Sequence, residues 1–473
     1  MTHTDRAPVQ PTVTRAPVAD DAVSVPVAIV GGGACGLTAA LALHRLGVDS
    51  VVLERDSTPS GSTALSSGFI PAAGTRAQQR QGLRDSPEAF AHDIGAKSRG
   101  QSDPALVTAY TQAIGPALDD LEIHHGITWQ VLDGFLYPGH GVHRMHTVAE
   151  KTGAALMQRL LRSADAAGIA VLTQARVTVL HVDEQQRVCG VGLLRPDGTR
   201  ESVRCEVLIL ACNGFGGNAQ RVQQHLPEMA QAIYAGHAGN DGSALAWAEQ
   251  LGAGVADMQA YQGHGSWAVP QGALISWALM MQGGVQINAH GLRFHDETAG
   301  YSEAAVTVLA QAGAQVWNVF DTPLLRLAEE FADFVSARDA GAVIRCADVQ
   351  ALAHVIGCEL APLQHTLASI QPGIDPLTGR VFQRALAWPL HAVRVTGALF
   401  HTQGGLAVNA QCRVLRQQGT PFPNLLAAGG AARGVSGNAV WGYLSGNGLL
   451  SAVAGGHIAA HTAAQLLAHQ EPS

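Results

Sequence analysis

The sequence predicts an α/β protein with two domains, on three observations. Near the N-terminus, an apolar strand runs directly into a glycine motif and a helix, the order found in nucleotide-binding βαβ units. Two later apolar strands, at residues 207–211 and 424–428, also end in glycine-rich segments. The 473 residues exceed the length that one hydrophobic core usually serves.

The first βαβ unit spans residues 25–54. A strand at 25–30 enters a GxGxxG motif, a helix at 37–46 leaves it, and a second strand follows at 51–53. The helix N-terminus then faces a pyrophosphate with free N–H groups and a partial positive charge. Glu54 ends the second strand, where a carboxylate can accept hydrogen bonds from a ribose. A glycine-rich turn without a ligand is the alternative, and the complete order argues against it. The predicted binding residues here are Gly31, Gly33, Ala34, Gly36, Glu54 and Arg55.

Three further segments indicate that the dinucleotide is FAD. Residues 61–75 are rich in glycine, small and hydroxyl side chains, which suit a phosphate–ribityl–ring ligand laid along the backbone. The strands at 207–211 and 424–428 then return to the same nucleotide. A large FAD site assembled from distant segments has this layout. The binding residues predicted in these segments are Thr63, Ala64, Ser67, Gly68, Asn213, Gly214, Gly429 and Gly430.

Composition narrows the class of protein. Hydrophobic residues make up 47% and charged residues 14%, with a net charge of −8, which argues against a nucleic-acid-binding face. The seven cysteines are scattered without CxxC spacing, which favours reduced thiols and a cytoplasmic location. The 21 histidines form no HExxH or comparable metal motif. Residues 1–24 are interpreted as a disordered lead-in, and the apolar stretch 448–468 as a buried helix without membrane insertion, because histidines interrupt it.

The chain resembles the fumarate reductase/succinate dehydrogenase flavoproteins, particularly soluble members such as 3-ketosteroid dehydrogenases and related ketone desaturases. Its landmarks are GGGACG (31–36), STALSSGFIPAAGT (62–75), ILACNGFGGN (209–218), NDGSALAWAEQLGAGVADMQAYQGH (240–264), NAHGLRFHDE (288–297), HTQGGL (401–406), FPNLLAAGG (422–430) and YLSGNGL (443–449). The resemblance implies a Rossmann-like FAD domain of the two-dinucleotide-binding type, discontinuous over 25–262 and 390–473. A smaller α+β capping domain, 263–389, is inserted, with a strand at 285–288 and helical stretches at 302–312 and 322–335.

The resemblance also places the active site. Fumarate reductases use two histidines, a Thr-Glu pair and two arginines that hold and protonate a dicarboxylate. The histidines match His264 and His401, the Thr-Glu pair matches Ser276 and Trp277, and both arginines are replaced, by Tyr301 and Tyr443. Tyrosine carries no permanent cation, so fumarate reduction is not expected. The resemblance further implies FAD contacts at Val177, Ser445, Asn447 and Leu449, and substrate contacts at Tyr443, Gly446, Asn447, Ser276, Trp277 and Arg433.

Two tyrosines suit a ketone. By resemblance to the ketone desaturases, Tyr443 and the N–H groups of 446–448 polarise the carbonyl, Tyr301 removes the α-proton, and the β-hydrogen leaves as hydride to flavin N5. Tyr301 then needs a neighbour that lowers its pKa, which the sequence does not identify. The alternatives are that the tyrosines and histidines only pack, and that Arg433 forms an ion pair at the surface.

The expected function is therefore an FAD-dependent desaturase of a cyclic ketone, either a 3-oxosteroid or a small oxo acid. The alternatives are the reverse reaction, reduction of an enone or unsaturated acid, and a flavin-binding electron-transfer subunit. FAD is expected to be non-covalent, because residues 62–68 lack the histidine that attaches it in respiratory complexes. No second GxGxxG resembles an NAD(P)H site, so the electron acceptor is external and unknown.

Overall fold

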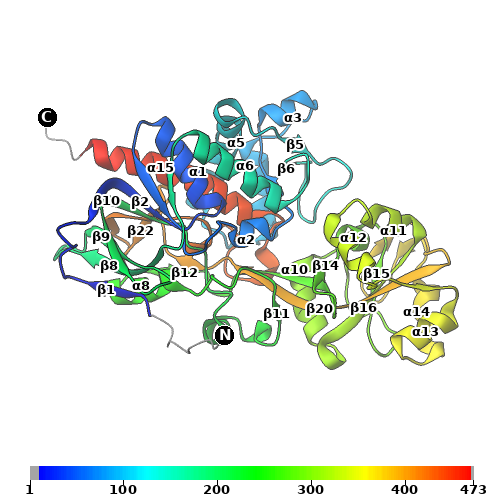
Figure 1. Cartoon of the computed structure of the whole chain (residues 1–473). Helices are drawn as coiled ribbons and strands as arrows, with labels where there is room; N and C mark the ends of the chain where they lie inside the picture. Colours follow the sequence, from blue (N-terminus) through cyan, green and yellow to red (C-terminus); the bar gives the residue numbers. More distant parts are fainter. Residues whose placement is uncertain (1–9, 470–473) are drawn as a thin grey trace.

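The computed structural model describes residues 10–469, and its helices and strands form two lobes (Figure 1). The large lobe is built on a nine-stranded sheet in the order β1-β8-β9-β10-β2-β3-β7, with β23 beside β10 and β22 beside β23. Its strands are β1 (Thr12–Thr14), β2 (Val23–Val30), β3 (Ser50–Leu53), β7 (Ala170–Leu172), β8 (Arg176–Val182), β9 (Val188–Leu194), β10 (Arg200–Leu210), β22 (Arg413–Leu415) and β23 (Pro421–Ala427).

The centre of this sheet is parallel and fully buried. β10, β2, β3 and β7 run parallel, and β23 runs parallel to β10. Apolar residues such as Ile29, Val52 and Ile209 are completely buried there, as continuous apolar strands require when helices cover a sheet. The three predicted strands that lead into glycine-rich segments, β2, β10 and β23, are thus parallel and end at the same edge of the sheet.

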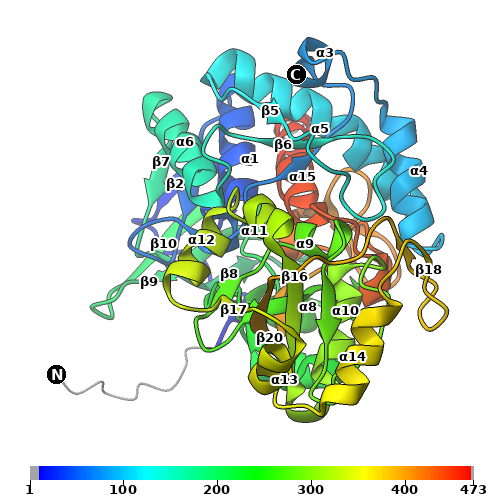
Figure 2. The ribbon, with the colours of Figure 1, turned by 90° about the vertical axis from the view of Figure 1, so that its right-hand side faces the viewer.

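Helices pack on this sheet through small residues. α1 (Ala34–Arg45) lies against α15 (Asn447–Ala468), where a Cβ on Gly456 would come within 2.4 Å of the Cys35 carbonyl oxygen. The stretch predicted as a buried helix is thus confirmed as α15. Figure 2 shows α1, α5 and α15 grouped together behind the small lobe. Other helices of this part are α3 (Arg76–Arg80), α4 (Pro87–Lys97), α5 (Pro104–His125), α6 (Gly153–Ala166), α7 (Ala219–His225) and α8 (Ser243–Leu251).

The small lobe is built on a second, seven-stranded sheet in the order β14-β13-β20-β16-β15, with β11 and β17 also paired to β20. Its strands are β11 (Ile233–Tyr234), β13 (Tyr261–Ala268), β14 (Ala273–Leu274), β15 (Val285–Ile287), β16 (Gln315–Asp321), β17 (Ile344–Cys346) and β20 (Leu390–Thr402). Its helices are α9 (Ala278–Met281), α10 (Tyr301–Leu309), α11 (Thr322–Ala328), α12 (Ala332–Asp339), α13 (Val349–Ile356) and α14 (Leu360–Ser369). The remaining short elements are α2 (Gly61–Ala64), β4 (Ile70–Pro71), β5 (Gln130–Val131), β6 (Met145–Thr147), β12 (Val255–Ala256), β18 (Gly373–Ile374), β19 (Val381–Phe382) and β21 (Gly405–Leu406), with 3-10 turns η1 (Pro227–Met229), η2 (Ala312–Ala314), η3 (Gly429–Ala431) and η4 (Val440–Gly442).

Two sequence expectations need correction. The helical stretch expected at 322–335 is two helices, because the chain is extended at Phe331 before α12 begins. The lead-in expected to be disordered contains β1, which pairs in parallel with β8. The side chain of Gln250 reinforces β1, since it accepts from the Val13 N–H and donates to the Pro11 carbonyl. Residues 1–9 lie outside the described residues. The predicted domain boundaries near 263 and 390, close to the first residues of β13 and β20, stay predictions.

Candidate active site

One elongated pocket runs between the lobes and is lined by segments from the whole chain. Its wall includes the end of β2, the 61–69 segment, the turn after β10, the end of β20 and the start of α15. The predicted cofactor residues that line it are Gly31, Gly33, Ala34, Glu54, Arg55, Thr63, Ser67, Gly68, Val177, Asn213, Gly429, Gly430, Ser445 and Leu449. The predicted catalytic and substrate residues that line it are His264, Ser276, Trp277, Tyr301, His401, Tyr443 and Gly446.

Five predicted site residues do not line this pocket. Gly36 and Gly214 allow close packing, because neither position has room for a side chain. A Cβ on Gly36 would come within 1.9 Å of the Gly31 oxygen, and a Cβ on Gly214 within 2.0 Å of Thr402 Oγ1. Asn447 is fully buried and donates to Ser436 Oγ. Arg433 forms ion pairs with Asp103 and Asp257, as the ion-pair alternative for it supposed, and its role as a substrate contact stays a prediction. Ala64 is half-buried behind the wall.

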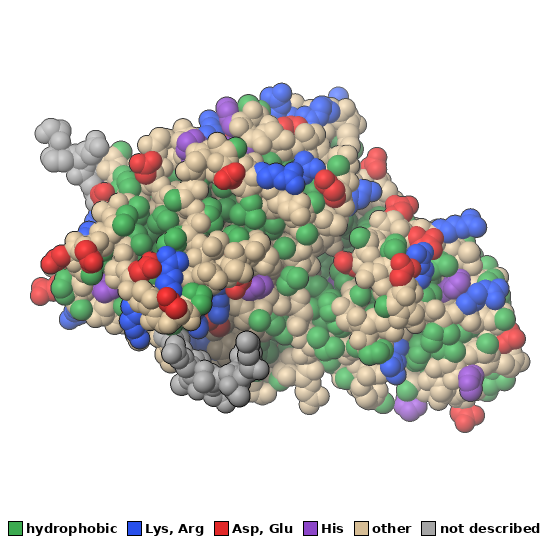
Figure 3. Space-filling model, viewed as in Figure 1, with side chains coloured by type: hydrophobic (Ala, Val, Ile, Leu, Met, Phe, Trp, Pro, Cys, Tyr) green, Lys and Arg blue, Asp and Glu red, His purple; other side chains and the backbone are tan. Residues whose placement is uncertain are grey.

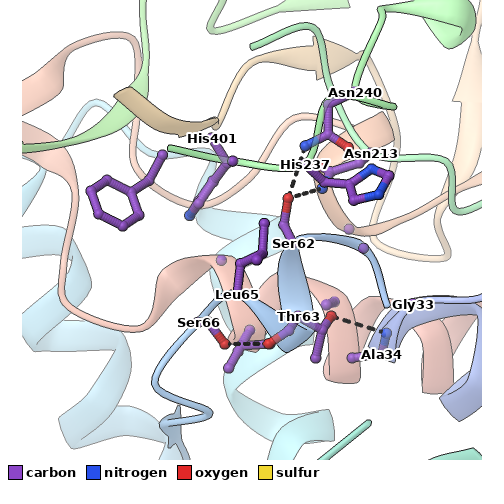
Figure 4. A pocket seen from close by; sticks show the side chains of 18 of the residues that line it. Gly33, Ala34, Ser62, Thr63, Leu65, Ser66, Asn213, His237, Asn240 and His401 are labelled. Atoms are coloured by element: carbon purple, nitrogen blue, oxygen red, sulfur yellow. Dashed lines mark hydrogen bonds between the residues drawn. The ribbon is translucent and has the colours of Figure 1, made fainter. Parts of the chain in front are cut away.

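The nucleotide end is shaped by the glycine turn. Gly31 has φ +110°, and a Cβ there would come within 2.5 Å of the Ala211 carbonyl oxygen. α1 begins after Gly33 with no side-chain cap, so its N-terminal N–H groups point into the pocket. The Ala34 N–H donates to Thr63 Oγ1 over 3.2 Å (Figure 4). This uncapped N-terminus beside a turn without side chains fits the pyrophosphate of FAD.

Glu54 and Arg55 organise the neighbouring loops. Glu54 Oε2 accepts from the Gly32 N–H at 2.8 Å and Oε1 from the Asp56 N–H at 2.9 Å. These bonds hold the carboxylate at the pocket wall, and its oxygens keep lone pairs that can accept further hydrogen bonds. Arg55 donates instead to the Gly239 carbonyl and to Asp241, so its guanidinium anchors the 239–241 loop.

The sequence analysis missed a group of hydrogen-bonding residues in the middle of the pocket. Ser62 Oγ accepts from Asn213 Nδ2 at 3.2 Å and from Asn240 Nδ2 at 2.8 Å, which ties three distant segments together (Figure 4). His237 lines the same wall and pairs with Asp56 at 3.0 Å. Ser62 is the first residue of the 62–75 landmark, and Asn240 is the first residue of the 240–264 landmark. Their positions in these landmarks were the signal that could have identified them.

The far end of the pocket carries the tyrosine pair. Tyr301 is the first residue of α10, and its ring stacks on His264 with centroids 4.9 Å apart. Tyr443 follows η4, and its ring meets that of Tyr301 at 6.1 Å, edge to face. The ring of His401, at the end of β20, packs edge to face against the ring of Tyr443, with the ring centroids 5.7 Å apart. The four residues predicted from separate motifs thus form one contiguous cluster.

Close packing brings α10 to this position. The buried face of α10 carries Ala304, Ala305 and Val308, one and two turns after Tyr301. A Cβ on Gly265 of β13 would come within 2.7 Å of Ala304 Cβ, so this glycine lets the helix lie directly on the sheet. The strand and helix therefore place His264 and Tyr301 face to face.

Burial sets the protonation of these groups. The pKa of His264 is lowered to about 3 by burial, and that of His401 to about 4, so both rings are neutral at pH 7. The Ser266 N–H donates to His264 Nδ1, which leaves the ring proton on Nε2. Burial raises the pKa of Tyr301. Hydrogen bonds with Ser445 and Tyr443 lower this pKa, but their effect is smaller than that of burial. The pKa of Tyr443 is also raised by burial, although N–H groups of Gly446 and Gly448 act in the opposite direction.

The tyrosine end of the pocket lacks basic side chains in the described part of the chain. Among the described residues that line the whole pocket, Arg55 and Arg176 are the only arginines or lysines, and both contact Asp241 at the nucleotide end. The tyrosine end is walled by Phe69, Tyr137, Leu274 and Phe331. Tyr137 was missed; burial and the nearby Tyr301 raise its pKa. A carboxylate substrate would find hydrogen-bond donors here and no bidentate cation.

Other sites and surfaces carry no competing chemistry among residues 10–469. No group of three or more metal-ligating side chains occurs there, and all seven cysteines are free. None of the helices in that range is both long and apolar enough to cross a membrane. On the face in Figure 3, basic and acidic side chains are interspersed.

Comparison with known proteins identifies the family. Residues 26–449 match the family described as FAD binding domain. A probable fumarate reductase of Shewanella frigidimarina (strain NCIMB 400) is 27% identical and covers 96% of this chain and 77% of the relative. The open conformation of a flavocytochrome c3 fumarate reductase superposes with a TM-score of 0.79 at 26% identity, over 94% of this chain and 78% of that one.

A second solved structure shares the fold. The 3-ketosteroid-Δ4-(5α)-dehydrogenase of Rhodococcus jostii RHA1 has a TM-score of 0.77 at 24% identity, over 96% of this chain and all of that one. These similarities confirm the α/β fold class and the resemblance to fumarate reductase flavoproteins. The chain belongs to the FAD binding domain family and is an FAD-dependent oxidoreductase related to the fumarate reductases.

Proposed function

We propose that this enzyme introduces a C=C bond next to the carbonyl of a neutral cyclic ketone. The observation that carries the proposal is the tyrosine pair at an end of the pocket whose described lining residues include no lysine or arginine. Tyr301 and Tyr443 stand 6.1 Å apart between ring centroids, with neutral His264 and His401 around them. Such a site offers hydrogen-bond donors to a carbonyl oxygen and no charge partner for a carboxylate.

The residues have separate roles in this reaction. The N–H groups of Gly446 and Gly448 interact with the Tyr443 hydroxyl and favour its ionised form, so Tyr443 is the group that donates to the carbonyl and stabilises the enolate oxygen. Tyr301, stacked on His264, takes the α-proton. Trp277 fixes this corner, because its Nε1–H donates to the Glu297 carbonyl at 2.9 Å. FAD, bound in this pocket without a covalent link, would supply the acceptor for the β-hydrogen as hydride.

Reduction of an enone is a second candidate, and one observation favours it. Because burial raises the pKa of Tyr301, its hydroxyl is protonated at neutral pH and is ready to donate a proton. The same site then runs in reverse, with a hydride delivered to the β-carbon and the Tyr301 proton to the α-carbon. The identity of the external electron donor or acceptor is not assigned for either direction of the reaction. The free cysteine thiols favour a location in the cytoplasm.

The test mixes the yellow holoenzyme anaerobically with a panel of candidate substrates and monitors the loss of flavin absorbance. The panel holds a 3-oxosteroid, a 4-oxocyclohexanecarboxylate and succinate. We expect bleaching by the neutral 3-oxosteroid and not by the anionic oxo acid, at a rate that rises with pH because the base form of Tyr301 becomes populated only at alkaline pH. Tyr301→Phe should retain FAD and lose this reaction. Bleaching by succinate alone would overturn the proposal, and fast reoxidation of reduced enzyme by an enone at neutral pH would favour the second candidate.

A further inference from the structure

Lysine is almost absent from this chain, and one of its two lysines is buried beside the active site. Lys151 is exposed, whereas the side chain of Lys97 is only 13% exposed. Lys97 is the last residue of α4, in the large lobe. Burying a long cationic side chain is costly unless it is paired, so its position calls for a partner.

The partners of Lys97 lie in the small lobe, on either side of Tyr301. Its Nζ donates to the Ala299 carbonyl at 3.2 Å and forms an ion pair with Glu303. Ala299 and Glu303 precede and follow Tyr301 by two residues. One ammonium group thus holds both ends of the five-residue segment at whose centre the tyrosine stands.

The start of α10 depends on this contact. Its N-cap, Gly300, has φ +145° and provides no side-chain cap. Glu303 lies at the third helical position, where its charge favours the helix dipole, and its Oε2 is buried without a hydrogen-bond partner among the described residues. Lys97 is therefore the group that compensates this carboxylate and fixes the first turn of α10.

The same end of α4 also touches the segment that carries Tyr443. The Arg99 guanidinium stacks on the ring of Trp441 at 4.2 Å. Trp441 lies in η4, and Tyr443 follows η4 directly. Residues 97–99 thus contact both tyrosine-bearing segments from one side.

We propose that Lys97 is a positioning residue that sets the geometry of the Tyr301–Tyr443 pair by clamping residues 299 and 303 to the large lobe. The proposal rests on the proposed function for its effect on turnover, and on the structure alone for its effect on the tyrosine. A shift of about 1 Å in a reacting group lowers turnover about a hundredfold, so loss of the clamp should act on kcat more than on KM.

The experiment compares Lys97→Met with Lys97→Arg and with Lys151→Met, the same change at the exposed lysine. We expect Lys97→Met to keep FAD and to lose about ten- to a hundredfold in kcat with little change in KM. Lys97→Arg should recover most of the turnover, because it restores a cation with several donors, and Lys151→Met should match the unmodified enzyme. Unchanged kcat in Lys97→Met, or no recovery in Lys97→Arg, would overturn the proposal.

Two further measurements keep the test decisive. If the unpaired Glu303 prevents Lys97→Met from folding, the double variant Lys97→Met/Glu303→Leu removes both charges, and turnover equal to that of the unmodified enzyme in it would refute positioning. A crystal structure of the variant holoenzyme should show loss of the 4.9 Å stacking of Tyr301 on His264. This readout needs no substrate: a displaced Tyr301 in an enzyme that oxidises no ketone would refute the proposed function and leave the positioning role standing.

Discussion

Acidification should destabilise this protein strongly between pH 7 and pH 5, because burial holds histidines neutral. Three of them are buried rings, and the half-buried His401 and His457, whose pKa values are also lowered to about 4, add to the effect. Burial lowers the pKa of His140 and His146 to about 4 and that of His264 to about 3. The unfolded chain, with histidine pKa values near 6.5, binds more protons than the native state in this range. Stability is therefore lost as the pH falls through about 6.5, and the loss continues until the native pKa values near 4 and 3 are reached.

The magnitude follows from the same values. A histidine with a pKa of about 6.5 unfolded and about 4 native costs about 2 kcal/mol on going from pH 7 to pH 5. Three such residues together cost about 5 kcal/mol, which is comparable to the whole stability of many domains. Carboxylates with lowered pKa, such as Glu297, titrate below this window and add little to the change.

Urea unfolding of the holoenzyme at pH 7, 6 and 5, followed by far-UV circular dichroism and flavin fluorescence, measures this loss. His264→Gln keeps an acceptor for the Ser266 N–H and removes one titrating group. It should reduce the pH-dependent loss by about 2 kcal/mol. A free energy of unfolding that is flat between pH 7 and pH 5, or a His264→Gln variant with the same pH dependence as the unmodified enzyme, would refute the reasoning.

Three other predictions concern the pocket. Gly36→Ala puts a methyl group 1.9 Å from the Gly31 oxygen, so we expect destabilisation of about 1–3 kcal/mol and protein purified without yellow colour; a normal flavin content would contradict this. Tyr443→Phe removes one donor to the carbonyl and should lower kcat about 10²–10³-fold with FAD retained, as measured by steady-state kinetics. Acid precipitation should release all FAD into the supernatant, and yellow pelleted protein would show a covalent link instead.

The central sheet could be predicted because local sequence specifies it: an apolar strand that ends in GGGACG gives β2 and α1 with few alternatives. Tyr301 and Tyr443 were singled out through the resemblance to the ketone desaturases, and their catalytic roles stay predictions. The contact of Tyr301 with His264 could not be read from the sequence, because it depends on α10 lying on β13. Arg433 shows the same limit: only the fold brings Asp103, more than 300 residues away, to its guanidinium.

Residues that act through partners were the hardest to foresee. Ser62 was passed over beside Thr63 because a serine in a glycine-rich stretch carries no mark of its two asparagine partners. Lys97 is the last residue of an ordinary helix and belongs to no recognisable motif. β1 could not be predicted for a similar reason, because a three-residue strand forms through its pairing with β8 and has no apolar pattern of its own.

The pairing of β13 with β20 has a mechanical consequence for the enzyme. β20 runs from the small-lobe core at Leu390 to His401 at the pocket, so the two lobes share a continuous strand (Figure 1). The ladder with β13 is regular except for irregularities between Gln262 and Gly263 and between His264 and Trp267. Bending is easiest where pairing is interrupted. His264 lies between these two points, so any opening of the small lobe would tilt its ring and change the stacking on Tyr301 at the same moment as it admits substrate.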